Sequence, residues 1–295
     1  MVKKLASEIT KDDKAEAEDA AEEPVEELST FGEVIRTVFW AVVIALGVRT
    51  VAYEPFNIPS ESMLPTLLVG DYLFVSKYPY GYSKHALPFS LDLFSGRILE
   101  GPVKRGDIAV FKRPLDNQTD YIKRIVGLPG DRMQVLNGQL HINGEPVKRQ
   151  WVADYEFEET PNESCLDRPE YRFRGADGAV FCRYPMYRET LPNGVSYLTL
   201  DLDPDWPWDN TRVYVVPQGH YFAMGDNRDN SSDSRKPPTT GVGFVPAENL
   251  VGRAEIIFFS TDGSAAWWQP WYWFQAMRFG RFFDSLRGSP EVAED

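Results

Sequence analysis

The sequence predicts a mostly β protein that follows one apolar N-terminal helix. Short runs rich in β-branched and aromatic residues recur from residue 71 to residue 260, and helical periodicity is nearly absent between residues 54 and 262. Asn137-Gly138 lies between two apolar runs, a pattern typical of a type I′ hairpin. With 295 residues, the chain can form one or two domains with a proper core.

Composition narrows the function classes. The chain carries 44 acidic against 31 basic residues, a formal net charge of −13, which argues against a nucleic-acid binder because such a protein needs a basic face. Two cysteines rule out a disulfide-rich scaffold and a four-cysteine zinc site, and three histidines without an HExxH motif leave out the usual metallohydrolases. We therefore expect no metal and no organic cofactor.

The N-terminal region divides into an acidic tail and an apolar segment. Residues 1–30 hold ten acidic residues against four lysines, so we expect a disordered tail. Residues 31–53 are the candidate transmembrane anchor, although the uncharged stretch 37–48 would span only roughly 18 Å as a helix. Arg36 and Arg49 can extend it by reaching toward the two interfaces. A buried core helix remains the alternative, and the acidic lead-in disfavours a cleaved signal peptide.

The β region is expected to be interrupted by an insertion. Strands are predicted at 71–77, 107–112, 121–126, 212–216, 220–224 and 251–260, with a hairpin over 132–144. Residues 151–210 are polar, contain six prolines and are predicted to be irregular. Cys165 and Cys182 lie there; a disulfide would contribute roughly 3 kcal/mol, and two free thiols are the alternative.

The C-terminal region 263–295 is aromatic. Four of the eight tryptophans fall within residues 267–273, and Arg278, Arg281 and Arg287 follow. An amphipathic helix in the lipid headgroup region suits this composition, since tryptophan favours that interface and arginine attracts anionic lipid. A helix packed on the β core is equally compatible.

Three segments, 59–66, 120–131 and 225–235, combine reactive and polar residues. Each alone has an ordinary explanation: Ser62 as a turn serine, Lys123 as a strand lysine facing water, and 225–235 as a polar loop. That loop lacks the ligand spacing of a calcium site.

Taken together, the segments point to nucleophilic catalysis. A serine hydroxyl needs a base, and no histidine lies in a suitable motif. A lysine that is shielded from water has a lowered pKa and can serve instead, and Lys123 stands among apolar neighbours. The backbone N–H of Ser62 and the hydroxyl of Ser60 could stabilise an oxyanion.

The chain resembles the bacterial type I signal peptidases (leader peptidases), membrane-bound Ser/Lys proteases that remove signal peptides from exported preproteins. The resemblance rests on Ser62-Met-Leu-Pro-Thr66 and the segments 105–111, 121–131 and 225–235, in matching order and spacing, and it covers about residues 50–260. All four segments together are specific, whereas any one of them is a weak signal.

The resemblance implies a role for each matching residue. Ser62 would be the nucleophile, Lys123 the general base, Ser60 the hydroxyl of the oxyanion hole, and Ser231 the residue that orients the lysine. Asp226, Asp233 and Arg235 would hold the last segment in shape. It also implies an antiparallel β catalytic core, 54–136 and 215–262, with a second β region inserted at 137–214, and a cleft that prefers small residues one and three places before the cut.

The same resemblance implies where the protein works. We expect a single-pass protein of the bacterial inner (cytoplasmic) membrane, with its acidic tail in the cytosol and its catalytic domain facing the periplasm. Its partners would be the signal peptides of preproteins, membrane lipid and the secretion translocon. Two alternatives are a Ser/Lys peptidase dedicated to one substrate, such as a pilin-type protein, and a scaffold that has lost catalysis.

Overall fold

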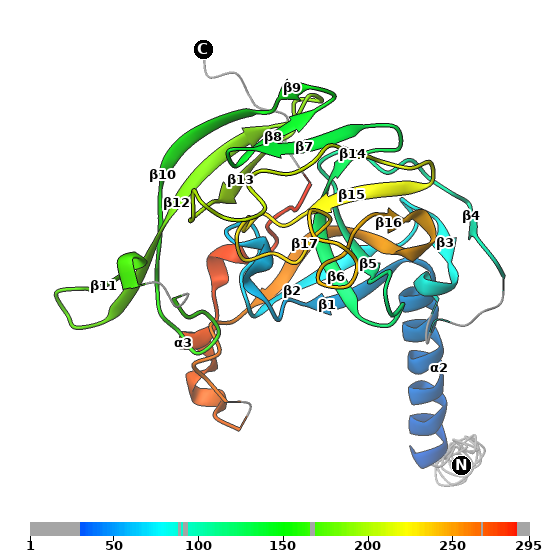
Figure 1. Ribbon diagram of the computed structural model, residues 1–295. Helices are drawn as coiled ribbons and strands as arrows, with labels where there is room; N and C mark the ends of the chain where they lie inside the picture. The colour runs from blue at the N-terminus through cyan, green and yellow to red at the C-terminus, as the bar shows by residue number, and fades with distance from the viewer. Residues whose placement is uncertain (1–29, 88–89, 91–93, 166–168, 267, 288–295) are drawn as a thin grey trace, which may run out of the picture. The chain divides into compact units, whose positions relative to one another are not determined.

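The computed structural model describes residues 30–287 apart from 88–89, 91–93, 166–168 and 267 (Figure 1). The chain splits into two compact units, Met1–Leu46 and Gly47–Asp295. The predicted acidic tail lies outside the described residues, except for Thr30, the first residue of helix α2. That part of the prediction therefore stays untested.

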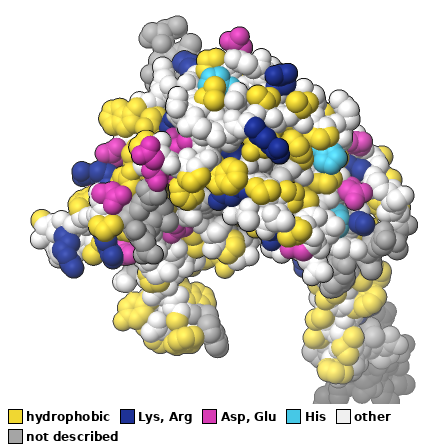
Figure 2. Space-filling view, viewed as in Figure 1, with side chains coloured by type: hydrophobic (Ala, Val, Ile, Leu, Met, Phe, Trp, Pro, Cys, Tyr) yellow, Lys and Arg dark blue, Asp and Glu magenta, His cyan; other side chains and the backbone are white. Residues whose placement is uncertain are grey.

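Helix α2 (Thr30–Val51) is long and apolar enough to cross a membrane. Its 22 residues correspond to a length of about 33 Å, close to the thickness of the hydrocarbon layer. The helix thus extends past Arg36 and Arg49, as the anchor prediction required, and ends two residues before the expected 53. Side chains 31–49 are exposed, which favours the anchor over a buried core helix; Figure 2 shows hydrophobic side chains along this helix.

A seven-stranded antiparallel sheet forms the centre of the β region, in the order β1-β2-β17-β5-β6-β15-β16. Its strands are β1 (Tyr53–Asn57), β2 (Asp71–Ser76), β5 (Ile108–Lys112), β6 (Asp120–Gly127), β15 (His220–Met224), β16 (Val245–Pro246) and β17 (Leu250–Ser260). Residues 71, 73 and 75 of β2 are buried and alternate with more exposed ones, and one face of the sheet packs on a cluster that includes Met63, Leu73 and Ile257. The mostly antiparallel β fold is confirmed.

A second sheet contains the predicted hairpin, β7 (Arg132–Leu136) and β8 (Gln139–Ile142). Asn137 and Gly138 form the two-residue turn with φ of 48° and 75°, so the type I′ turn is confirmed. β9 (Glu145–Pro146) and β14 (Tyr214–Val215) complete this sheet. A small pair, β3 (Tyr82–Ser83) and β4 (Arg97–Ile98), stands apart from it. Short 3-10 helices lie at Glu61–Met63 (η1), Lys84–Ala86 (η2), Pro169–Tyr171 (η4) and Ala247–Asn249 (η5).

Strands occupy much of the segment that was predicted to be irregular. β10 (Lys148–Glu158) and β12 (Val180–Thr190) run side by side as a long ribbon, with β11 (Arg172–Arg174) and β13 (Ser196–Leu200) beside β12 (Figure 1). The expectation of irregular structure was wrong because aromatic residues spaced two apart, such as Tyr155 and Phe157, pack against a buried cluster despite the polar residues between them.

The two cysteines are joined. Cys165 and Cys182 form a disulfide with a Cα–Cα distance of 5.5 Å, which joins the segment before β11 to β12, and both belong to a buried hydrophobic cluster. The alternative of two free thiols is therefore wrong. The division of the β region into a core and an insertion at 137–214 remains a prediction.

In its described part, residues 263–266 and 268–287, the aromatic C-terminal region does not form the expected amphipathic helix. It contains η6 (Pro270–Tyr272), the four-residue α3 (Trp273–Ala276) and η7 (Phe279–Arg281). Arginines attach this segment to the β region: Arg278 bonds Glu163 at 2.8 Å and Arg281 bonds Asp71 at 2.7 Å. These ion pairs hold the segment against Asp71 at the start of β2 and against Glu163, and its backbone follows short turns between them.

Candidate active site

The nucleophile candidate lies on η1, directly after strand β1. Ser62 is buried, and the backbone around it is tied to the loop 225–235. Asn227 donates its backbone N–H to the Ser62 carbonyl at 3.2 Å and its side-chain amide to the Glu61 carbonyl at 3.1 Å. The loop therefore fixes the turn that presents the serine hydroxyl.

Lys123 lies in the middle of β6, opposite Ala109 of β5. Its Nζ is 2.6 Å from Ser62 Oγ and 2.8 Å from the carbonyl oxygen of Ile122. The side chain is only 3% exposed, and burial lowers the pKa of Lys123 to about 8 although nearby carboxylates oppose the shift. A lysine with this pKa is neutral in about a tenth of molecules at pH 7.

Arg124, the next residue of β6, holds Asp226 of the loop. Its guanidinium donates to both carboxylate oxygens, at 2.8 and 2.6 Å, in a buried pair. Thr66 donates its hydroxyl to the same carboxylate at 2.6 Å. Asp226 thus connects the segment after Ser62 with the strand that carries Lys123.

Asp233 and Arg235 form a second buried pair within the loop, at 3.0 and 2.9 Å. Burial alone would raise the pKa of Asp233, but Arg235 and a bond from the Gly225 backbone N–H hold it below its usual range. The carboxylate is therefore ionised, and together with Asp226 it favours the charged form of Lys123. Burial lowers the pKa of Lys123 by more than these two carboxylates raise it.

Ser231 lies close to the nucleophile backbone but makes no bond to the lysine. Its Oγ is buried and has no hydrogen-bond partner among the described residues. A Cβ placed on Gly225 would lie 2.3 Å from Ser231 Oγ and 2.5 Å from the Ser62 carbonyl oxygen. Only glycine leaves room there, a requirement that the sequence alone did not indicate. The orienting role of Ser231 stays a prediction.

Ser60 is exposed, and its Oγ lies 3.4 Å from Ser62 Oγ. Its hydroxyl can therefore reach a group bound at the nucleophile, as an oxyanion donor must.

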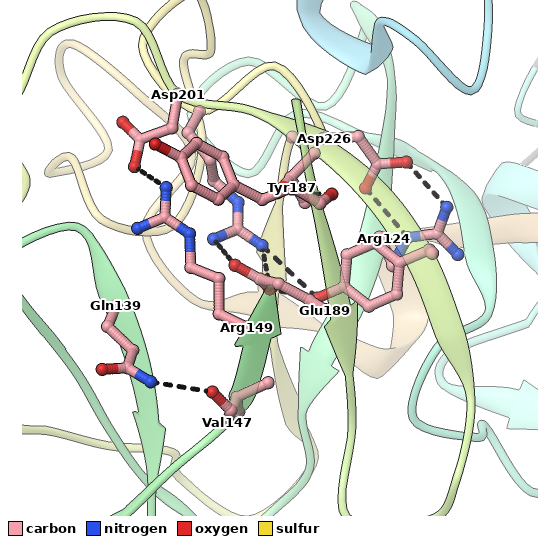
Figure 3. A network of polar contacts seen from close by, with 12 residues as sticks. Arg124, Gln139, Val147, Arg149, Tyr187, Glu189, Asp201 and Asp226 are labelled. Atoms are coloured by element: carbon pink, nitrogen blue, oxygen red, sulfur yellow. Dashed lines mark hydrogen bonds and ion pairs between the residues drawn. The ribbon is translucent and has the colours of Figure 1, made fainter. Parts of the chain in front are cut away.

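Sequence reasoning missed a buried polar network beside this site (Figure 3). Glu189 of β12 accepts from Arg228 of the loop at 2.7 and 2.5 Å and from the Tyr197 hydroxyl at 2.9 Å. The Tyr197 ring in turn lies under the Arg124 guanidinium, 4.2 Å from its carbon to the ring centre. Nothing in the local pattern of these residues signals that they meet, since they are up to about a hundred positions apart.

Three carboxylates form a separate cluster, in which Asp201, Asp209 and Asp229 bring an oxygen each within 4.8 Å of one another. Burial and the two neighbouring acids raise the pKa of Asp209 to about 7. Arg149 pairs with Asp201 and offsets part of this charge. Only Asp229 of the three comes from the loop 225–235.

Comparison with known proteins gives consistent matches. A model of the family described as "Signal peptidase, peptidase S26" matches residues 31–259. Signal peptidase I of Rickettsia typhi is 37% identical over 268 residues, 84% of this chain and 90% of that protein. Signal peptidase I of Rickettsia canadensis is 37% identical over 273 residues, 85% and 92% of the two chains. A crystal structure of a signal peptidase I from Enterococcus faecalis shows 23% identity and a TM-score of 0.28, covering 52% of this chain and 96% of that one.

Proposed function

The chain belongs to the signal peptidase family, peptidase S26, and we propose that Ser62 and Lys123 carry its reaction. It is a serine endopeptidase that removes signal peptides from preproteins, as the relatives named signal peptidase I indicate. The observation that supports the assignment of the two residues is the 2.6 Å contact between Lys123 Nζ and Ser62 Oγ in a buried site. The relatives do not support a peptidase dedicated to one substrate.

The geometry supports the following sequence of steps. Neutral Lys123 accepts the Ser62 proton as Oγ attacks the carbonyl carbon of the scissile bond. The Ser62 backbone N–H and the Ser60 hydroxyl stabilise the oxyanion. The protonated lysine then donates to the leaving amine, which leaves an acyl-enzyme on Ser62. The leaving amine is the new N-terminus of the mature protein, so the acyl group on Ser62 is the signal peptide. Lys123 next takes a proton from water as the water oxygen attacks the ester carbonyl carbon, and it returns this proton to Ser62 Oγ as the signal peptide leaves with a free carboxyl group.

Cleavage of a preprotein with a small-x-small site tests the assignment, using the full chain in detergent–lipid micelles. Ser62→Ala and Lys123→Ala should each abolish cleavage. Lys112→Ala is the matched control, because Lys112 lies on the neighbouring strand β5 and its ammonium bonds only surface groups, the Asp120 carboxylate and the Gln118 carbonyl, among the described residues. Normal cleavage by Lys123→Ala across the pH range would refute Lys123 as the base.

Helix α2 fits a membrane-anchored enzyme. We propose that the anchor lies in the bacterial inner membrane and that the β region faces the periplasm. The Cys165–Cys182 disulfide supports this side, because disulfides persist in oxidising compartments and are rare in the cytosol. Protease added to intact spheroplasts should digest the β region. Trimming of the first 30 residues with survival of the β region would refute this orientation.

Membrane lipid is the second proposed partner, and the C-terminal segment supports it. Trp271 and Phe274 are 66% and 74% exposed, and Figure 2 shows hydrophobic side chains gathered on the projection that contains α3. Aromatic side chains of this kind favour the headgroup region. The expected contact with the secretion translocon stays a prediction that rests on the resemblance alone.

Brominated phospholipid in the micelles tests the lipid contact, since bromine quenches nearby tryptophan. Trp271→Ser should remove part of the quenching. Trp151→Ser, a change on β10 at a side chain that is 63% exposed, should leave the quenched component intact. Equal effects of the two variants would refute the assignment of the lipid contact to the C-terminal segment.

A further inference from the structure

Strand β13 contacts Arg124 of β6, the strand that carries Lys123, through Tyr197. This tyrosine of β13 is buried, and its ring lies 4.2 Å from the guanidinium carbon of Arg124, the neighbour of Lys123 on β6. A guanidinium held on an aromatic face is attracted by the ring and kept in one plane. That plane is the one in which Arg124 makes its two bonds to Asp226.

Tyr197 is itself held by a buried ion pair. Its hydroxyl donates to Glu189 at 2.9 Å, and Arg228 donates to the same carboxylate through two nitrogens. Burial raises the pKa of Tyr197 well above its usual range, so the hydroxyl keeps its proton and remains a donor. The ring therefore cannot rotate away without leaving a buried carboxylate with one bond fewer.

The backbone of β13 also pairs with the loop that carries Asp226. The N–H of Leu200 donates to the Asp226 carbonyl at 2.9 Å, and the N–H of Arg228 donates to the Leu200 carbonyl at 2.8 Å. Strand β13 thus contacts both halves of the buried pair, the arginine through a ring and the aspartate through its main chain.

We propose that Tyr197 is a positioning residue for the Ser62–Lys123 pair, acting through Arg124 and Asp226; this inference rests on the proposed roles of Ser62 and Lys123. Strands β12 and β13 then contribute to the catalytic centre although none of their side chains reaches the reacting atoms.

The charges around Lys123 determine in which direction its pKa moves when the Tyr197 contact is lost. Asp226 and Asp233 are the acids that act on the lysine, and each is paired, with Arg124 and Arg235 respectively. The titratable groups that act on Arg124 besides Asp226 are Tyr197, whose hydroxyl is neutral, and Arg228. When Arg124 is free to leave Asp226, the carboxylate loses its partner and favours the charged lysine more strongly, so the base titrates at higher pH.

The test compares the pH dependence of kcat/KM between pH 6 and pH 10 for the full chain in detergent–lipid micelles. Tyr197→Leu should move the profile upward by up to one pH unit, which means a loss of up to about tenfold at pH 7 and of under about twofold at pH 10. Tyr197→Phe keeps the ring and loses only the hydroxyl, so its profile should lie between those of the wild type and Tyr197→Leu.

Tyr187→Leu is the matched control. It removes a stack of the same kind in the same sheet, where the Tyr187 ring lies 3.7 Å from the Arg149 guanidinium carbon, but Arg149 pairs with Asp201 and not with Asp226 (Figure 3). Its profile should keep the wild-type midpoint.

Other results separate the two proposals. An equal loss at every pH for Tyr197→Leu and Tyr197→Phe, or an unmoved midpoint, overturns the positioning role while leaving the serine and lysine assignments intact. Should Tyr197→Leu fail to fold, the Tyr197→Phe midpoint decides alone, because that change preserves shape: an unmoved midpoint overturns the role. Activity in Lys123→Ala overturns the catalytic assignment itself, whatever the profile of the Tyr197 variants.

Discussion

The buried lysine should make the enzyme less stable than it would be without that charge, and Lys123→Met measures by how much. Methionine has a similar length and no charge, so it fills the same space. In the folded chain the pKa of Lys123 is lowered to about 8 by burial, whereas an unfolded chain has the ordinary value of roughly 10.5. Below pH 8 the folded protein therefore buries a charged ammonium group, and unfolding would expose that group to water.

This difference corresponds to about 3 kcal/mol of lost stability at pH 7. The loss shrinks between pH 8 and pH 10.5, because the folded lysine is neutral there while the unfolded one is still charged, and about 1 kcal/mol remains at pH 10. The hydrogen bonds of Nζ to Ser62 and to Ile122 also disappear in the variant, at a cost of about 1 kcal/mol each. That cost depends far less on pH, so the change with pH isolates the charge.

Urea unfolding of the full chain in detergent micelles, at pH 7 and pH 10, is the assay. The stability of Lys123→Met relative to the wild type should be greater at pH 7 than at pH 10 by roughly 2 kcal/mol. Lys112→Met, at the surface, should show no such difference. The reasoning that burial lowers the pKa of this lysine would be refuted if the gain in the free energy of unfolding of Lys123→Met over the wild type were equal at both pH values, or larger at pH 10.

Further predictions concern the pH dependence of kcat/KM, Gly225, the Cys165–Cys182 disulfide and Asp209. In the wild type, kcat/KM should rise about tenfold per pH unit up to pH 8 and then level off; a profile that levels off near pH 6 contradicts a lysine base. Gly225→Ala should lower cleavage at least about a hundredfold, since its Cβ would collide with the nucleophile backbone, while Gly280→Ala, with nothing within 4 Å, should keep wild-type rates. Reducing the disulfide should lower the free energy of unfolding by about 3 kcal/mol, and an unchanged unfolding midpoint after complete reduction contradicts this. Asp209→Asn should stabilise the chain more at pH 8 than at pH 5. The folded pKa of the Asp209 carboxyl is raised to about 7, so its charged form destabilises the folded chain and this cost is complete only above pH 7. The opposite order of the two unfolding midpoints contradicts the raised pKa.

Local patterns were sufficient for the features whose causes are local. Asn137-Gly138 indicated its hairpin because both residues tolerate positive φ, and the strand around Lys123 was recognisable from its β-branched neighbours. The resemblance brought Ser62 and Lys123 together, and the structure places their reactive atoms in contact.

Features that depend on distant partners were out of reach. The strand β12 was missed because its aromatic alternation is interrupted by charged residues and by Pro185. The C-terminal segment was expected to be helical because nothing in its sequence tells that Arg278 and Arg281 meet Glu163 and Asp71. The contact of Tyr197 with Arg124 likewise depends on tertiary packing.

The short connection between α2 and the nucleophile limits which peptide bonds the enzyme can reach. Helix α2 ends at Val51, and Ser62 follows only eleven residues later. Even a fully extended chain of that length spans at most about 40 Å, and strand β1 occupies part of it. With α2 in the bilayer, the serine hydroxyl stays within that distance of the membrane surface. Substrate choice then has a spatial component: a bond carried farther out in a folded, released protein is beyond the reach of the tether, whatever residues flank it.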